Sequence, residues 1–216
     1  MRYTNLEGKK WIGDLSLPDA DVLVSLGSKA KRILEFGVGG STHLLAQCKP
    51  DTLICLDTSG EWLEITKVKL AKITEKTQPT LVHYELLDEV LAFNEQPFQL
   101  IFVDGVDDLR IDFANRTWEH LAVGGVMVFH DTHRREDMVN ALNTTMKYFT
   151  EVETVFLNAN DSFGNSSNMT VLLKKAEQSY VNWNYEENKP LESYHAHLTS
   201  IEHPLWNYSL GKFDED

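Results

Sequence analysis

The alternation of short apolar, β-branched runs with longer amphipathic runs constrains the fold of this chain more than any other feature. Such alternation is typical of a mostly parallel sheet with helices on both faces. Strands are expected over residues 32–36, 52–57, 81–85, 99–104, 125–129, 153–157 and 168–174. Helices are expected over 41–47, 61–73, 111–121 and 135–148, after an earlier one that Ser16 caps and Gly27 ends. The sequence therefore predicts an α/β fold with a doubly wound sheet of seven strands.

The last two expected strands break the alternation. Only residues 158–167, rich in Asn, Ser and Gly, separate them, and this loop is too short for a packed crossover helix. We therefore expect the two strands to pair antiparallel and to close the sheet as a hairpin. Five strands joined by helices and followed by a hairpin is an uncommon order for a doubly wound sheet.

Charge and composition narrow the functional classes. Apolar residues make up 42% of the 216 residues, which excludes extended disorder. Acidic residues outnumber basic ones by 33 to 20, and the net charge of −13 would repel a phosphate backbone. The first ten residues have no apolar stretch typical of a signal peptide, and no run of about 18 apolar residues occurs. We expect a soluble, cytoplasmic protein that binds neither nucleic acid nor a membrane.

The composition changes near residue 175. Residues 176–216 hold seven aromatic residues without a clear period. Clustered Trp and Tyr side chains more often anchor packing than bind a ligand, so this C-terminal appendage is expected to pack across the domain or to form a homodimer. The expected division is an N-terminal helical extension over 1–30, a ligand-binding domain over 31–175 and the appendage over 176–216.

A glycine-rich stretch carries the sharpest local signal. Residues 33–42 read Ile-Leu-Glu-Phe-Gly-Val-Gly-Gly-Ser-Thr, so a buried strand turns through three glycines and opens a helix. Glycine lets a ligand approach the backbone closely, and the first turn of a helix offers unpaired amides. Tight turns also need glycine for structural reasons alone, so the stretch indicates either a turn or a bound nucleotide-like cofactor. The candidate residues are Glu35, Gly37, Gly39, Gly40, Ser41 and Thr42.

An acidic residue at the end of the second strand supports the cofactor interpretation. Asp57 follows Gly37 by twenty residues, where a doubly wound sheet places a carboxylate that accepts both hydroxyls of a ribose. Thr58 and Trp62 add a hydroxyl and an aromatic face to the same region. The alternative is a solvated acid at a strand end. Thr42 stands where a dinucleotide-binding loop needs a third glycine, which disfavours an NAD-dependent oxidoreductase.

Polar residues also follow the fourth and fifth strands. The fourth expected strand ends at Asp104, and His130, Asp131, Thr132 and His133 follow the fifth. Ligands bind at the carboxyl edge of such sheets, where these residues would meet. An imidazole titrates near neutral pH, so His130 or His133 could act as a catalytic base beside Asp104 and Asp131. The alternative is a polar cluster that caps the next helix.

Taken in order, these motifs resemble those of the class I S-adenosylmethionine-dependent methyltransferases. The matching elements are the loop at 35–42, Asp57, Phe-Val-Asp-Gly at 102–105, Gly-Gly-Val-Met-Val-Phe-His-Asp-Thr at 124–132 and the terminal hairpin. The resemblance spans residues 31–175 and is nearest to small-molecule O-methyltransferases. It implies a Rossmann-like methyltransferase fold, S-adenosylmethionine as cofactor, and methyl transfer to an oxygen of a small-molecule substrate.

The resemblance also implies roles for single residues. The loop glycines would line the methionine and ribose parts of the cofactor, and Glu35 would lie beneath its amino-acid part. Asp57 would hold the ribose hydroxyls, and Asp104 would lie near the sulfonium. Leu87 and Asp88 would border the adenine.

A divalent metal is not favoured. Metal-dependent O-methyltransferases carry an Asp-Asn pair at the end of strand five, and this chain has Asp131-Thr132 there. Asp104, Asp131 and His133 could still offer oxygen and nitrogen ligands to one ion. Related chains commonly carry a histidine within the stretch that is 107–110 here, so one family contact is absent. The main alternative to a methyltransferase is a protein that binds S-adenosylmethionine without transferring its methyl group.

Overall fold

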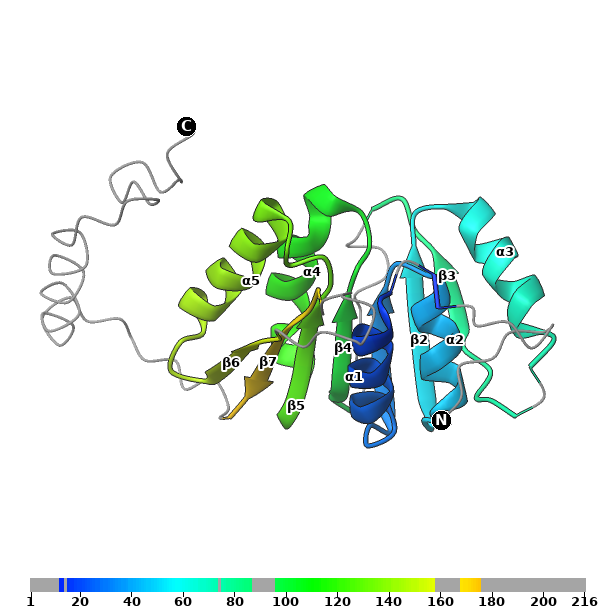
Figure 1. The fold of residues 1–216 in the computed structure, drawn as a ribbon, viewed down its shortest axis with the longest axis horizontal. Helices are drawn as coiled ribbons and strands as arrows, with labels where there is room; N and C mark the ends of the chain where they lie inside the picture. The colour runs from blue at the N-terminus through cyan, green and yellow to red at the C-terminus, as the bar shows by residue number, and fades with distance from the viewer. Residues whose placement is uncertain (1–11, 14, 74, 87–95, 158–167, 176–216) are drawn as a thin grey trace, which may run out of the picture. The chain divides into compact units, whose positions relative to one another are not determined.

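The computed structural model describes residues 12–13, 15–73, 75–86, 96–157 and 168–175. Seven strands form one sheet in the order β3-β2-β1-β4-β5-β7-β6 (Figure 1). The strands are β1 (Arg32–Phe36), β2 (Thr52–Asp57), β3 (Thr80–His83), β4 (Phe98–Val103), β5 (Leu121–Phe129), β6 (Val152–Phe156) and β7 (Thr170–Lys174). Strands β1 to β5 run parallel, and β7 runs antiparallel to both of its neighbours. The predicted α/β sheet and its closing hairpin are confirmed.

The strand order creates a crevice beside β1. Strands β2 and β3 follow β1 toward one edge of the sheet, and the next strand in the chain, β4, pairs with β1 on its other side. Open parallel sheets bind ligands at this kind of reversal, outside the carboxyl ends of the strands. Backbone pairing holds the ends of β1 and β4 together, since the amide of Asp104 donates to the carbonyl of Phe36 over 3.0 Å. The topology thus predicts a site after β1 and β4.

Helices cover both faces of the sheet (Figure 1). Among the described residues they are α1 (Leu17–Gly27), α2 (Gly40–Gln47), α3 (Gly60–Leu70), α4 (Arg110–Thr117) and α5 (Arg135–Lys147). Side chains alternate along each strand, so Ile33 of β1 packs with α1 and α2, whereas Leu34 and Phe36 pack with α4 and α5. Each face of the sheet therefore has its own apolar core.

Helix α1 belongs to the same compact unit as the sheet. Ser16 and Asp19 form a reciprocal capping box at its start, and Pro18 lies in its first turn. Ala20 and Leu23 are fully buried in the core on the α2 side of the sheet. The appendage over 176–216, with the homodimer contact expected for it, lies outside the described residues.

The region before β5 differs from the sequence prediction. The helix expected over 111–121 ends at Thr117, a short 3-10 turn follows, and β5 begins at Leu121 rather than at residue 125. Gly124 has a φ of +79° and the pairing of β4 with β5 shifts register between Phe98 and Leu100. This irregularity interrupts the apolar pattern on which a strand prediction depends.

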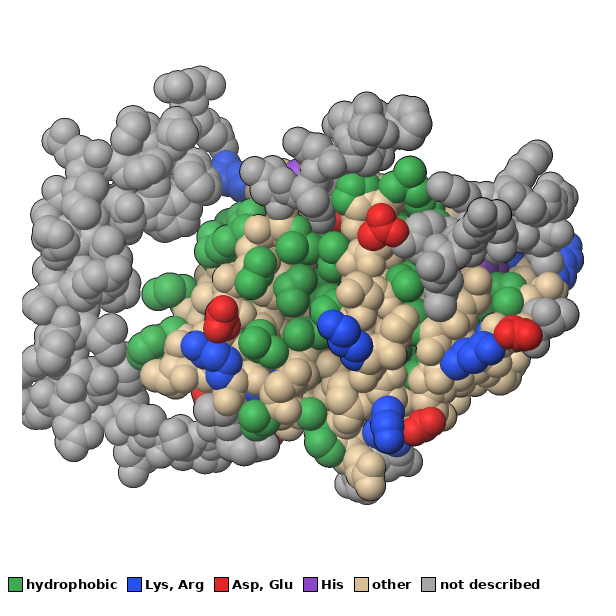
Figure 2. Space-filling model, turned by 60° about the horizontal axis from the view of Figure 1, so that its bottom comes forward, with side chains coloured by type: hydrophobic (Ala, Val, Ile, Leu, Met, Phe, Trp, Pro, Cys, Tyr) green, Lys and Arg blue, Asp and Glu red, His purple; other side chains and the backbone are tan. Residues whose placement is uncertain are grey.

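None of the described helices is both long and apolar enough to cross a membrane. On the face drawn in Figure 2, the basic side chains of the described residues stand singly, several beside an acidic one. Ion pairs in the structure include Lys49 with Glu75 at 2.8 Å and Lys67 with Glu64 at 3.1 Å. The negative net charge is therefore not offset by a basic patch on this face.

Candidate functional site

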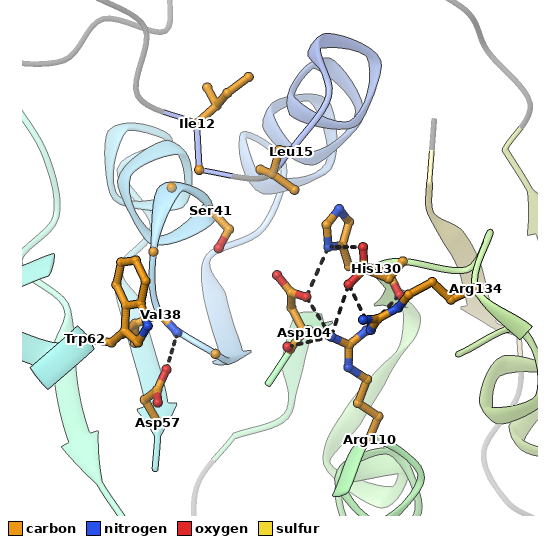
Figure 3. Close-up of a pocket in the computed structure, with 15 residues that line it drawn as sticks. Ile12, Leu15, Val38, Ser41, Asp57, Trp62, Asp104, Arg110, His130 and Arg134 are labelled. Carbon is orange, nitrogen blue, oxygen red and sulfur yellow. Dashed lines mark hydrogen bonds and ion pairs between the residues drawn. The ribbon is translucent and has the colours of Figure 1, made fainter. Parts of the chain in front are cut away.

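A cavity of about 650 Å³ lies at the carboxyl edge of the sheet, at the predicted reversal of strand order. Its volume is in the range of small-molecule sites. Figure 3 shows two sides facing each other across it: the glycine-rich loop after β1 with Asp57 and Trp62, and a polar cluster after β4 and β5. Ile12 and Leu15, which precede α1, form part of the wall.

The three loop glycines serve different purposes. Gly37 has a φ of +86°, and a Cβ there would lie 2.8 Å from the amide nitrogen of Gly105. A Cβ on Gly40 would collide with the backbone of Ile12. Gly39 faces open space in the part of the chain that the structure describes, because no atom beyond its two chain neighbours lies within 4 Å of where its Cβ would stand. The turn interpretation thus accounts for two glycines, and Gly39 alone leaves backbone open to the cavity.

Asp57 holds the loop in place. Its Oδ2 accepts the amide of Val38 at 2.8 Å, and its Oδ1 accepts the amide of Ser59 at 2.7 Å (Figure 3). Each carboxylate oxygen has a second lone pair, so both remain able to accept a ligand hydroxyl. Trp62 lies beside it with half of its surface exposed. Asp57 is therefore a fixed carboxylate on the cavity wall, not a freely solvated one.

The other loop residues lie mostly behind the cavity. The buried Thr42 accepts the amide of Gly39 at 2.9 Å through its hydroxyl. Ser41 reaches the cavity, whereas Thr58 presents its backbone carbonyl to the ring of His83. Glu35 is completely buried, and burial raises the pKa of its carboxyl to about 7, offset in part by the nearby Cys55, Ser41 and Thr42. Of the residues proposed at the adenine, Leu87 and Asp88 lie outside the described residues.

Opposite the loop, three titratable side chains meet. The Nδ1 of His130 lies 3.1 Å from Oδ1 of Asp104 and 3.4 Å from Oδ1 of Asp131. The guanidinium of Arg110 touches the same two carboxylates, with Nη2 at 3.2 Å from Asp104 Oδ1 and 3.3 Å from Asp131 Oδ2. Asp104, His130 and Asp131 thus come together as the sequence predicted.

His133 does not join this cluster. Asp131 has a φ of +59°, a conformation uncommon for residues other than glycine, and the turn it makes leaves His130 buried and His133 exposed. The amide of His133 donates to the side-chain carbonyl of Asn168 at 2.8 Å. The sequence predicted that Asp104, Asp131 and His133 could together ligate a metal ion. In the structure the histidine that lies beside the two carboxylates is His130.

The surroundings of His130 favour its charged form. Burial lowers the pKa of the imidazole, but the hydrogen bond to Asp104 and the charges of Asp104, Asp131 and Asp19 outweigh it and raise the pKa. The Nε2 atom points away from Asp104 and Asp131 toward α1 (Figure 3), where it lies 3.9 Å from Oδ2 of Asp19. His130 lines the cavity, with its Nδ1 facing the two carboxylates and its Nε2 buried without a hydrogen-bond partner among the described residues.

Sequence reasoning assigned no role to four residues that shape the cluster: Arg110, Arg134, Asp19 and Asn168. The side-chain amide of Asn168 donates to Asp131 at 2.9 Å, and its backbone amide donates to Asp19 at 2.8 Å. A Ser-x-x-Asp capping pattern could have identified Asp19 at the start of α1. The contacts of Arg110 and Asn168 join distant parts of the chain, and nothing in the local sequence indicates them.

Neither a protein-family model nor a curated protein sequence matches this chain. Solved structures do match. An O-methyltransferase from Bacillus cereus in complex with S-adenosylhomocysteine aligns with a TM-score of 0.63 and 18% identity over 74% of this chain and 83% of its own. An O-methyltransferase from Streptomyces achromogenes in complex with S-adenosylmethionine aligns with a TM-score of 0.61 and 18% identity, over 75% of this chain and 82% of its own. A methyltransferase from Podospora anserina, bound to S-adenosylhomocysteine, aligns with a TM-score of 0.55 and 17% identity, over 74% of this chain and 80% of its own. This chain has the fold of these methyltransferases.

Proposed function

We propose that this protein transfers a methyl group from S-adenosylmethionine to an oxygen of a small-molecule acceptor. The observation that carries the proposal is the open backbone of Gly39 beside the fixed carboxylate of Asp57, facing a polar cluster across one cavity. The three proteins of the same fold described above were crystallised with S-adenosylmethionine or S-adenosylhomocysteine, which supports the choice of cofactor.

The loop side of the cavity fits that cofactor. Gly39 leaves room for a ligand to lie directly against the backbone, a space that any Cβ would fill. Asp57 keeps lone pairs for two ribose hydroxyls, and the exposed indole of Trp62 offers an apolar face next to it. When bound, S-adenosylmethionine would supply a methyl group on a positively charged sulfur, and Asp57 and Asp104 are carboxylates on the wall of the same cavity.

The opposite side of the cavity is suited to the acceptor. Methyl transfer to a hydroxyl releases a proton, which needs a base within reach. Oδ1 of Asp104 is held by His130 and Arg110, and Figure 3 shows its other carboxylate oxygen turned toward the loop side of the cavity. We therefore propose Asp104 as the group that accepts the acceptor's proton, with His130 as its positioning residue.

Calorimetric titration tests the cofactor assignment. S-adenosylmethionine and S-adenosylhomocysteine should bind with one site per chain, and NADH, followed by its fluorescence, should not bind. A screen of hydroxylated small molecules with methyl-labelled cofactor then tests transfer. Tight binding with no labelled product from any acceptor would favour a binding protein that lacks activity, and binding of NADH alone would favour an oxidoreductase.

Replacing Asp57 with alanine should weaken S-adenosylhomocysteine binding by roughly 5- to 150-fold, or about 1–3 kcal/mol, because the ribose hydroxyls lose their acceptor. The melting temperature should fall modestly as well, since Val38 and Ser59 lose the partner of their amides. Asp51→Ala, at an exposed acid just before the same strand, is the matched control. Equal affinities for a folded Asp57→Ala protein and the parent would refute the ribose assignment.

A further inference from the structure

The polar cluster contains a set of atoms that could ligate a divalent cation. Asp104, His130 and Asp131 each offer one ligand atom, and the three atoms lie within 4.8 Å of one another. Two carboxylates are suitable donors for Mn²⁺ or Mg²⁺, and an imidazole could add a nitrogen ligand to Mn²⁺. Considered without their neighbours, these side chains would fit the metal that some O-methyltransferases use.

Arg110 already occupies the space between the two carboxylates. Its side chain is 4% exposed, and one nitrogen, Nη2, contacts both Asp104 and Asp131. The remaining donors are used as well: Nε donates to the carbonyl of Gly105 at 3.2 Å, and Nη1 donates to the carbonyl of His130 at 3.2 Å and to Asp137 at 2.8 Å. A guanidinium has five N–H groups, so none is left over for an acceptor molecule.

Asp137 also binds the guanidinium of Arg110, through Nη1. Its side chain lies in the first turn of α5 and is 2% exposed, and it also accepts Nε of Arg134 at 2.7 Å. Arg110 is therefore held by carboxylates that follow β4 and β5 and by one on α5. Because a buried arginine cannot lose its proton, its positive charge is permanent.

From this arrangement we infer that the guanidinium of Arg110 replaces the divalent cation of metal-dependent O-methyltransferases and closes Asp104 and Asp131 to metal ions. A metal bound to the same oxygens would stand against the fixed positive charge of Arg110 and would have to displace its hydrogen bonds. The half-exposed Arg134 adds a second, outer contact, with its Nη2 at 3.1 Å from Oδ2 of Asp131. His130 adds to the exclusion, because its Nδ1 faces the carboxylates as a donor when the ring is protonated. Arg110 is a positioning residue that sets the direction of both carboxylates.

Mn²⁺ binding, measured by calorimetry and by the electron paramagnetic resonance signal of the free ion, tests this inference. The parent protein should bind no Mn²⁺ at this cluster with a dissociation constant below about 1 mM. Arg110→Ala should bind Mn²⁺ at least about tenfold more tightly than the parent, and adding Asp131→Asn should remove the gain. Arg110→Lys keeps the charge and should behave like the parent, and Arg116→Ala on the exposed side of α4 is the control for the helix.

Two outcomes would overturn the inference. One is micromolar Mn²⁺ binding by the parent protein that Asp131→Asn abolishes. The other is a folded Arg110→Ala protein that gains no Mn²⁺ affinity. If Arg110→Ala does not fold, the parent measurement and Arg110→Lys decide the question. Neither experiment requires the methyl donor, so the inference can fail while the proposed function stands.

Discussion

Gly39→Val should abolish binding of S-adenosylmethionine and S-adenosylhomocysteine while leaving the fold intact. Of the three loop glycines, Gly39 alone would direct a side chain into open space, and that space is the cavity. An isopropyl group there would occupy the volume needed by a ligand lying on the backbone. We expect affinity to fall at least about 100-fold, on the order of 3 kcal/mol. Calorimetry gives the affinity, and a thermal melt of the same sample gives the stability.

A matched glycine provides the control for this substitution. Gly60, the first residue of α3, is not among the residues that line the cavity, and among the described residues no atom outside its own helix and chain neighbours lies within 4 Å of where a Cβ would stand. Gly60→Val should leave binding unchanged. By contrast, Gly40→Ala should destabilise the protein, because its methyl group would collide with the backbone of Ile12. If Gly39→Val retained the parent's affinity, the ligand would not lie on the loop and the cofactor assignment would fail.

The sheet and the loop side of the site could be predicted because their signals are local. Apolar alternation shows where parallel strands end, and the ends of parallel strands meet at one edge. Glu35, Asp57 and Asp104 were therefore placed at or near the correct edge before the fold was known. The same reasoning could not tell that Glu35 is buried behind the cavity, because burial depends on how α2 and β2 pack against it.

The polar cluster was only partly predictable because single backbone angles and distant contacts decide it. Asp131 adopts a left-handed conformation, which leaves His130 buried and His133 exposed, and residue spacing does not reveal this turn. The sequence marks the stretch 107–110 only as a departure from the family pattern and indicates no role for Arg110. Its partner Asp137 lies 27 residues away on another helix, so the salt bridge at 2.8 Å becomes visible only once α4 and α5 are packed together.

Asp104→Asn should lower the rate of methyl transfer at least about 100-fold, the scale expected when a general base is removed. The amide carbonyl can still accept from His130 and Arg110, as Oδ1 of Asp104 does, so the cluster keeps most of its contacts. The group turned toward the cavity becomes an NH₂, which cannot take a proton. Steady-state kinetics with the acceptor found by screening would measure the loss, and Asp112→Asn at an exposed acid of α4 is the control.

His130 supplies a second readout that separates an intact cluster from a collapsed one. Its pKa is raised above the ordinary 6.5, so the stability it contributes is fully present below that pH and is lost as the pH rises through the folded value. Asp104→Asn removes one of the charges that raise this pKa, so the imidazole should titrate at lower pH, as NMR of the ring protons would show. The loss of stability with rising pH should then be smaller and should end at a lower pH, because its onset near 6.5 is set by the unfolded chain. A slow variant with this shifted titration would support Asp104 as the base, whereas an unchanged rate with the same shifted titration would leave the carboxylate with only an orienting role.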